Sequence, residues 1–191
     1  MIEKQIKAGP FTFSPTGLDG SFVVEPGLFS DNRGWFFRSY SDEAFAEMGL
    51  NTTWPQANHS FTQQKGSIRG MHFQYPPFGE IKLVRCVSGA VLDIIVDIRK
   101  DSPTYLQHFS IELNPTNKRM LYIPQGFAHG FQTLKDDCEL LYMHSATYQP
   151  GSEGGLRFND AQLNLTWPLP LTIISERDSN HPMITNDFKG I

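Results

Sequence analysis

Short runs of apolar and β-branched residues, separated by Gly, Pro and Asn, recur along most of the chain. Runs of this composition that are bounded by turn-forming residues predict β-strands. Their spacing of roughly ten residues is typical of a β-sandwich or β-barrel. The predicted strands cover residues 20–26, 34–40, 67–74, 81–89, 90–99, 108–114, 119–126, 128–134 and 138–148. The pattern therefore predicts a mostly β fold with a few short helices.

Helical signals are confined to two segments. In residues 41–50, Ser41 precedes acidic residues and Gly49 stands near the end, which is typical of a helix N-cap and a helix stop. A second short helix is predicted near 158–163. Because the sequence has no internal repeat and no linker of low complexity, we expect one domain over residues 1–191. We expect a short N-terminal extension at about 1–17 and a C-terminal tail at about 176–191.

Several predicted strands carry ionisable side chains where apolar ones are expected. Arg69 and His72 lie in one strand, Lys82 in the next and Asp93 in the one after, while Tyr142 belongs to the last. Buried charges cost free energy unless they are paired. The set therefore predicts a polar interior that holds a ligand. We expect both Arg69 and His72 to line it.

Each of these residues also has a structural explanation when it is considered alone. A single histidine in a strand, such as His72, is more often structural than catalytic. Lys82 could face solvent, and Tyr142 could belong to the core. Asp93 and Asp97 could lie on different faces or form ion pairs with the arginines at 85 and 99. Only the combination indicates a site, and it leaves both an enzyme and a catalytically silent binding barrel open.

Composition excludes several classes of function. The net charge is −4, without the cluster of Lys and Arg that nucleic-acid binding needs. No apolar run approaches the roughly 20 residues of a membrane-spanning helix, and we expect no signal peptide at the N-terminus. Cys86 and Cys138 lack paired metal-ligand spacing, so we expect free thiols and a cytoplasmic location.

A metal-dependent barrel is the main alternative chemistry. Such sites commonly combine a pair of histidines with a nearby Glu. Here Gln74 stands two positions beyond His72, and the nearby Glu80 is followed by the cation Lys82. The sequence also has no G-x-S-x-G nucleophile motif. We therefore expect no catalytic metal and no cofactor. The other histidines outside residues 128–134 are scattered: His59, His108, His144 and His181.

Five segments resemble, in order, the dTDP-4-dehydrorhamnose 3,5-epimerases, and the resemblance covers roughly residues 18–182. The resemblance implies a cupin-like jelly-roll β-barrel and a homodimer. It also implies an isomerase that needs no metal, whose substrate is a nucleoside-diphosphate sugar with a 4-keto group. The segments are DNRGWFFRSY, NHSFTQQKGSIRGMHFQYPP, KLVRCVSGAVLDIIVDIRKDSPTY, IPQGFAHGF and SEGGLRFNDAQLNLTWP.

The resemblance also implies roles for single residues. His72 matches the catalytic base, Asp178 matches the acid that orients it, and Tyr142 matches the proton donor on the opposite side of the sugar ring. Lys82 matches a sugar-side contact, and its ammonium is suited to stabilise charge on the C4 oxygen. The expected substrate contacts are Arg69, His129, Arg33, Phe29, Gln56, Asn58, Tyr148 and Glu153.

Two positions depart from the pattern of this family. Arg38 stands where the family usually has an acidic residue, and Phe158 stands where it usually has Trp. Both positions match binding rather than catalytic ones, so they leave the nucleotide base and the exact sugar open. A related enzyme for another 4-keto sugar nucleotide, or one that inverts only C3 or only C5, stays an alternative. A metal-dependent cupin is a further alternative.

Overall fold

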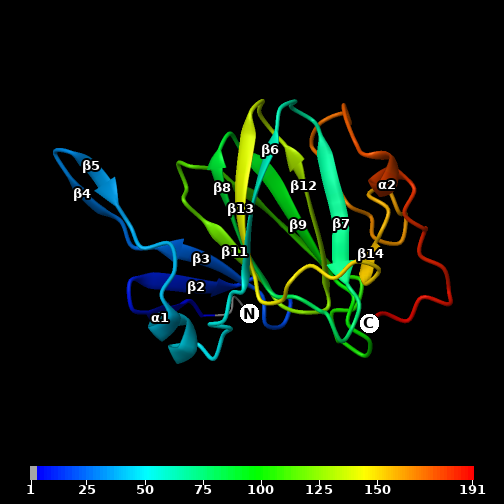
Figure 1. Cartoon of the computed structure of the whole chain (residues 1–191), viewed down its shortest axis with the longest axis horizontal. Coiled ribbons are helices and arrows are strands. Elements are labelled where there is room, and N and C mark those ends of the chain that lie inside the picture. Colours follow the sequence, from blue (N-terminus) through cyan, green and yellow to red (C-terminus); the bar gives the residue numbers. More distant parts are fainter. Residues whose placement is uncertain (1–3) are drawn as a thin grey trace.

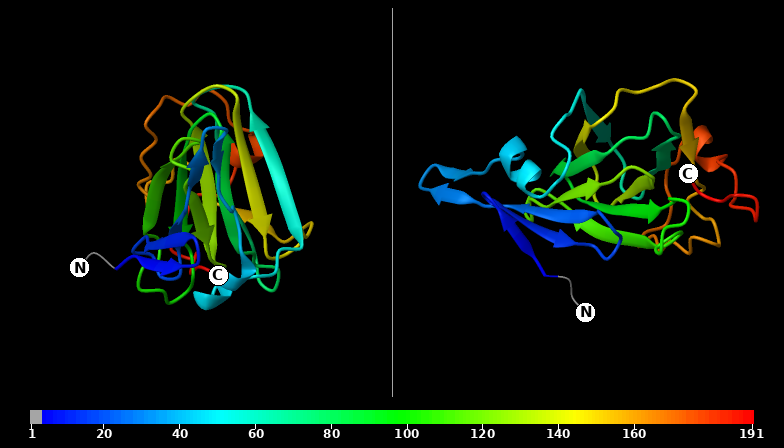
Figure 2. Two further views of the ribbon diagram at one scale, coloured as in Figure 1. Left: turned by 90° about the vertical axis from the view of Figure 1, so that its left-hand side faces the viewer. Right: turned by 90° about the horizontal axis from the view of Figure 1, so that it is seen from below.

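Two antiparallel β-sheets packed face to face form the body of the molecule (Figures 1 and 2), in a computed structural model that describes residues 4–191. The seven-stranded sheet has the order β1 (Ile6–Ala8), β2 (Phe11–Pro15), β3 (Phe22–Pro26), β11 (Met120–Ile123), β8 (Lys82–Ser88), β13 (Cys138–His144) and β6 (Gln56–Thr62). The five-stranded sheet has the order β10 (His108–Leu113), β9 (Val91–Asp97), β12 (Phe127–Thr133), β7 (Ile68–Gln74) and β14 (Glu153–Gly155).

Three smaller elements complete the fold. Strands β4 (Phe29–Asp31) and β5 (Gly34–Phe36) form a hairpin that extends away from the two sheets (Figure 1). Helix α1 (Asp42–Glu47) packs beside β1, and helix α2 (Glu176–Ser179) lies beside β7. Among residues 4–191, neither helix has the length that crossing a bilayer would require.

The prediction of a mostly β fold is confirmed, with exceptions in detail. Residues 158–163 form turns, so the helix predicted there is wrong. The helix predicted at 41–50 is shorter, and its N-cap Ser41 makes no side-chain capping hydrogen bond. The segment expected to be an N-terminal extension contributes β1 and β2 to the large sheet. The strands β4, β6 and β14 and the helix α2 were not predicted.

The interior between the sheets is apolar at one end. There, side chains of the large sheet, such as Val84 and Leu140, pack against Val91, Ile95 and Phe131 of the small sheet. Two further apolar layers cover the outer faces, one under α1 and one under the C-terminal segment. Strand β9 is therefore buried on both faces, which explains why its sequence reads as a continuous apolar run rather than as an alternation.

The other end of this interior is polar, and a β-bulge shapes it. His129 on β12 pairs with His72 on β7, whereas Phe131 pairs with Arg69, so two steps along β12 match three along β7. In a regular strand, residues three positions apart point to opposite faces. The extra residue in β7 lets both Arg69 and His72 line the interior. The sequence pattern did not predict this bulge, on which their shared face depends.

Two glycines allow the strands to meet closely at the bulge. A Cβ at Gly130 on β12 would lie 2.6 Å from Met71 Sδ and 2.7 Å from the Arg69 carbonyl oxygen. A Cβ at Gly70 on β7 would lie 2.6 Å from the Cα of Gly130. Real Cβ atoms do not approach so closely, so any side chain at either position would push β7 and β12 apart.

We therefore expect Gly130→Ala to lower the free energy of unfolding by about 1–3 kcal/mol, the usual cost of overpacking. Gly79→Ala is a matched control, because a Cβ there meets only Gln125, at 3.6 Å or more. Urea denaturation of both variants and the wild type measures the difference. Equal stability of the two variants would contradict this account of the bulge.

Candidate active site

A cavity of about 550 Å³ opens at the polar end of the interior. Both sheets contribute to it: β6, β8 and β13 on one side, β7 and β12 on the other. Six of the residues predicted from the sequence to act on or bind a substrate line it. These are Asn58, Arg69, His72, Lys82, His129 and Tyr142.

His72 forms a hydrogen-bonded pair with Asp178 of helix α2. Its Nε2 lies 2.8 Å from Asp178 Oδ1, while Oδ2 accepts a hydrogen bond from the Gly70 amide at 3.0 Å. The N-cap Ser175 accepts from the Asp178 amide at 3.0 Å, which fixes the helix end. Burial alone would raise the pKa of Asp178, but the hydrogen bond and charge of His72 outweigh it and hold that pKa well below its usual range. Nε2 therefore donates to an ionised carboxylate, and Nδ1 is the basic nitrogen.

Tyr142 enters the same cavity from the large sheet. Its strand β13 pairs with β6, and its hydroxyl lies 3.0 Å from Ser60 Oγ. Burial raises the pKa of Tyr142 well above its usual value, although the hydrogen bond to Ser60 offsets part of the effect. The phenol is therefore protonated at neutral pH, as a proton donor must be. His72 and Tyr142 thus line one cavity from two different sheets.

Lys82 belongs to a second charged group in the cavity. Its ammonium lies 3.1 Å from Glu80 Oε1, and Glu80 Oε2 accepts from His144 Nδ1 at 2.7 Å. Burial alone would raise the pKa of Glu80, but the hydrogen bond from His144 and the charge of Lys82 lower it to about 2. Sequence reasoning missed Glu80 and His144 as site residues. A signal for His144 was available, since it stands two positions after Tyr142 and so shares its strand face.

Asp93 is within hydrogen-bonding distance of His129. Both carboxylate oxygens lie 3.0 Å from His129 Nε2, and both side chains are buried. The sequence left open whether Asp93 and Asp97 pair with arginines. Asp97 does, because its Oδ2 lies 2.7 Å from Arg99 Nη2. Asp93 instead orients a histidine that lines the cavity. This pairing was not predicted, because strand patterns do not specify which residues of different strands meet.

A hydrogen-bonded chain runs along the mouth of the cavity. Gln56 Oε1 accepts from the Tyr148 amide at 2.9 Å, and the Tyr148 hydroxyl donates to Glu153 Oε2 at 2.9 Å. Arg177 donates to Glu153 Oε1 at 3.1 Å, and its Nε donates to Asp178 Oδ1 at 3.4 Å. Three predicted binding residues are therefore linked to the His72 pair through Arg177, which sequence reasoning missed.

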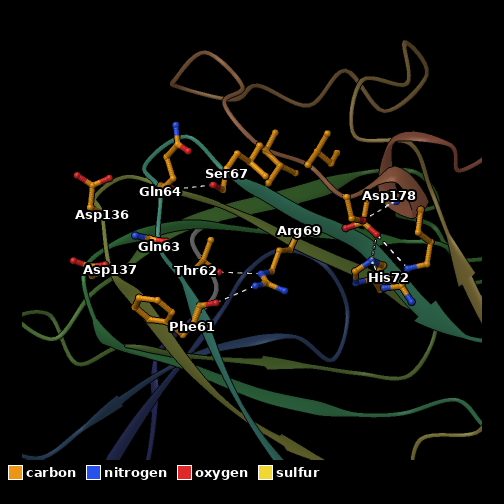
Figure 3. A pocket seen from close by; sticks show the side chains of 15 residues that line it. Phe61, Thr62, Gln63, Gln64, Ser67, Arg69, His72, Asp136, Asp137 and Asp178 are labelled. Carbon is orange, nitrogen blue, oxygen red and sulfur yellow. Dashed lines mark hydrogen bonds and ion pairs between the residues drawn. The ribbon is translucent and has the colours of Figure 1, made fainter.

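A groove of about 970 Å³ adjoins the cavity, and Arg177 and Asp178 of α2 belong to its lining (Figure 3). Arg69 and His72 line both spaces, so the two adjoin at these side chains. Arg69 is held by Thr62 and Phe61: its Nε donates to the Thr62 hydroxyl at 2.9 Å and its Nη2 to the Phe61 carbonyl at 3.0 Å (Figure 3). Its guanidinium thus lies at the junction of cavity and groove, where a phosphate group can be bound.

Two predicted binding residues, Arg33 and Phe29, are not brought to this cavity by their own chain. Both line a separate pocket of about 550 Å³ on the β4–β5 hairpin, which shares no lining residue with the cavity. Arg33 pairs with Asp31 at 2.6 Å and is largely exposed. Arg38, which follows β5, is also exposed. Figure 1 shows the hairpin on the side of the molecule away from β7 and α2.

One group of side chains has a composition that suits a metal ion. Ligand atoms of His72, Asp178 and His181 all lie within 4.8 Å of one another, and two imidazoles with a carboxylate are typical zinc ligands. The guanidinium of Arg177, 3.2 Å from His72 Nε2, adds a positive charge that opposes a cation at the same place. Burial lowers the pKa of His181, and the neighbouring His72 lowers it further.

Comparisons with known proteins identify the family. Residues 15–186 match the family described as dTDP-4-dehydrorhamnose 3,5-epimerase. The dTDP-4-dehydrorhamnose 3,5-epimerase of Salmonella typhimurium is 43% identical over 171 residues, which cover 88% of this chain and 93% of that protein.

Solved structures agree with the sequence comparison. The crystal structure of dTDP-4-dehydrorhamnose 3,5-epimerase from Elizabethkingia anophelis superimposes with a TM-score of 0.90 at 36% identity, covering 94% of this chain and all of that one. A Legionella pneumophila epimerase in complex with dTDP-4-keto-L-rhamnose gives a TM-score of 0.86 at 35% identity and covers 91% and 92% of the two chains. These relatives confirm the cupin-like fold expected from the sequence, and the chain belongs to the dTDP-4-dehydrorhamnose 3,5-epimerase family.

Proposed function

We propose that this protein inverts C3 and C5 of dTDP-4-dehydro-6-deoxy-glucose and so forms dTDP-4-dehydrorhamnose. One observation carries the proposal: a histidine held by a carboxylate and a protonated tyrosine line the same cavity from different sheets. The Legionella relative, which is bound to dTDP-4-keto-L-rhamnose, supports the substrate class.

The chemistry begins with the 4-keto group, which acidifies the C–H bonds at C3 and C5. A neutral imidazole is a suitable base near pH 7, because its unperturbed pKa is about 6.5. His72 removes the proton through Nδ1. Asp178 fixes its tautomer and stabilises the imidazolium that forms, as the carboxylate of a hydrolase triad does.

Removal of the proton leaves an enolate with negative charge on the C4 oxygen. Lys82 is only 7% exposed, and an ammonium stabilises such a charge far more strongly away from bulk water. Inversion then needs a proton from the other face of the ring. Tyr142 supplies it, because its raised pKa keeps the phenol protonated until the enolate forms.

The hairpin β4–β5 supports a homodimer. Its large apolar side chains Phe29, Trp35 and Phe36 are 62%, 56% and 64% exposed, and apolar clusters of this kind usually mark an interface. A second copy of the chain that covers the hairpin would place Arg33 and Phe29 near the partner's cavity. This explains how two residues expected to bind substrate can lie so far from their own His72. The buried free thiols of Cys86 and Cys138 support a cytoplasmic location.

We expect His72→Ala to reduce turnover by about 10²–10⁴-fold, the usual contribution of a general base. Incubation with dTDP-4-dehydro-6-deoxy-glucose in deuterated water, followed by NMR, should show deuterium at C3 and C5 with the wild type and almost none with the variant. His108→Ala, on an exposed strand position, is the control. Activity of the wild type should survive EDTA. Deuterium at only one of C3 and C5 would show that the enzyme inverts only that carbon. Undiminished turnover by His72→Ala would refute the assignment of His72 as the base.

Tyr142→Phe should separate two steps of the reaction. The variant keeps the base, so deuterium exchange at the acidified carbons should continue, while inverted product falls by about 10²–10⁴-fold. Tyr105→Phe is a matched control, because that hydroxyl bonds only the Phe188 carbonyl, at 3.1 Å. If exchange and product formation fell by the same factor, Tyr142 would not be a dedicated donor for the second face.

A mixing experiment tests whether the hairpin serves the partner's site. Arg33→Ala should raise KM, and His72→Ala should remove turnover. Co-expressed in one cell, the two variants should form mixed dimers with one intact site and regain activity. In that site the Arg33→Ala chain supplies His72, and the His72→Ala chain supplies the hairpin with Arg33. Light scattering should give the mass of a dimer. A monomer, or mixed dimers without regained activity, would contradict the proposal.

A further inference from the structure

Glu80 bridges two basic side chains inside the cavity. One of its carboxylate oxygens lies 3.1 Å from the ammonium of Lys82, and the other accepts a hydrogen bond from His144 Nδ1 at 2.7 Å. The side chains of all three are close to buried, at 11%, 9% and 9% exposure. Charges so far removed from water are costly unless they are paired, so this bridge fixes how the ammonium is held.

His144 holds the second oxygen of the carboxylate in place. Nδ1 lies 2.7 Å from Glu80 Oε2, and Asn58 Nδ2, an amide donor, lies 3.2 Å from the other ring nitrogen. The imidazole also stacks on the ring of Tyr142, with centroids 6.1 Å apart and planes 28° apart. His144 and Lys82 are directly paired across β13 and β8. Rotation of Glu80 away from Lys82 would break this bond to His144.

The surroundings of Lys82 make the counter-charge necessary. Burial lowers the pKa of an amine, and so do neighbouring cations. Arg69 on β7 lines the same cavity, together with His72, His129 on β12 and Tyr142 on β13. Within residues 4–191, Glu80 is the one carboxylate within 4.0 Å of the Lys82 ammonium. Loss of its charge would leave a buried ammonium without a carboxylate in a cavity that Arg69 also lines.

We propose that Glu80 and His144 are positioning residues that keep Lys82 protonated and aimed at the carbonyl oxygen of the substrate. Glu80 supplies the counter-charge, and His144 fixes its direction. One carboxylate oxygen of Glu80 contacts the Lys82 ammonium, and the other contacts His144. Glu80 therefore interacts with both side chains at once. This inference rests on the proposed function, because the developing oxyanion belongs to that reaction.

Glu80→Gln keeps the shape of the side chain and removes its charge. The pKa of the Lys82 ammonium should fall, so the alkaline limb of the kcat profile should move to lower pH by roughly one unit or more. At pH values above the wild-type limb, kcat should fall about tenfold or more, with a smaller change in KM. Glu80→Asp keeps the charge and should restore the limb. Glu25→Gln is the control, since Glu25 pairs with Arg119 at 2.8 Å on the half-exposed outside of the sheet.

His144→Ala separates direction from charge. Glu80 keeps its ion pair with Lys82 in this variant, so the alkaline limb should stay in place while kcat falls at every pH. Thermal melting of each variant shows whether it folds. An unmoved limb in folded Glu80→Gln, or an unchanged kcat in folded His144→Ala, would overturn the proposal.

A measurement without substrate distinguishes failure of this inference from failure of the proposed function. Trace acetylation of the protein with acetic anhydride at a series of pH values, read by peptide mass spectrometry, gives the titration midpoint of Lys82. The midpoint should lie lower in Glu80→Gln than in the wild type and in Glu25→Gln. Should the wild type not turn over 4-keto sugars, a lowered midpoint would still support the positioning of Lys82. Equal midpoints in folded proteins would overturn it even in an active enzyme.

Discussion

The pairing of buried ionisable groups is the constraint on which the rest of the molecule depends. A β-sandwich of this size normally fills its interior with apolar side chains, and here one end of that interior holds imidazoles, carboxylates, an ammonium and a phenol. Each charge there would cost several kcal/mol if left alone. The fold offsets the cost by giving a carboxylate to His72, to His129 and to the pair of His144 and Lys82. The same pairs fix which nitrogen of each ring carries the proton.

These pairs join segments that are distant in the sequence. Asp178 comes from a short helix near the C-terminus, where the Ser175 cap and the Gly70 amide hold it against β7. Asp93 reaches His129 across two paired strands. The apolar layers on the outer faces of both sheets hold the strands that carry these groups. The cavity is therefore preorganised by the core, and catalysis needs little movement of its charged side chains.

Much of the fold could be read from the sequence, because strands buried on one or both faces leave apolar runs between turn residues. The lumen was predicted from Arg69, His72, Lys82 and Tyr142, which interrupt such runs. Three features could not be read in this way. The bulge that brings Arg69 and His72 to one face depends on close contact of β7 with β12. The meeting of Asp93 with His129 and of His144 with Lys82 depends on register between strands. The distance of Arg33 from the cavity depends on the direction of a hairpin.

The central claim is that one sugar ring lies between His72 and Tyr142 with its two faces exposed to different groups. A crystal structure of the protein with dTDP-glucose, which lacks the acidifying ketone and cannot react, tests this most directly. The account predicts the hexose in the cavity, with the imidazole within hydrogen-bonding or van der Waals reach of one face and the phenol on the other. A hexose bound outside the cavity, or both groups on one face of the ring, would contradict it.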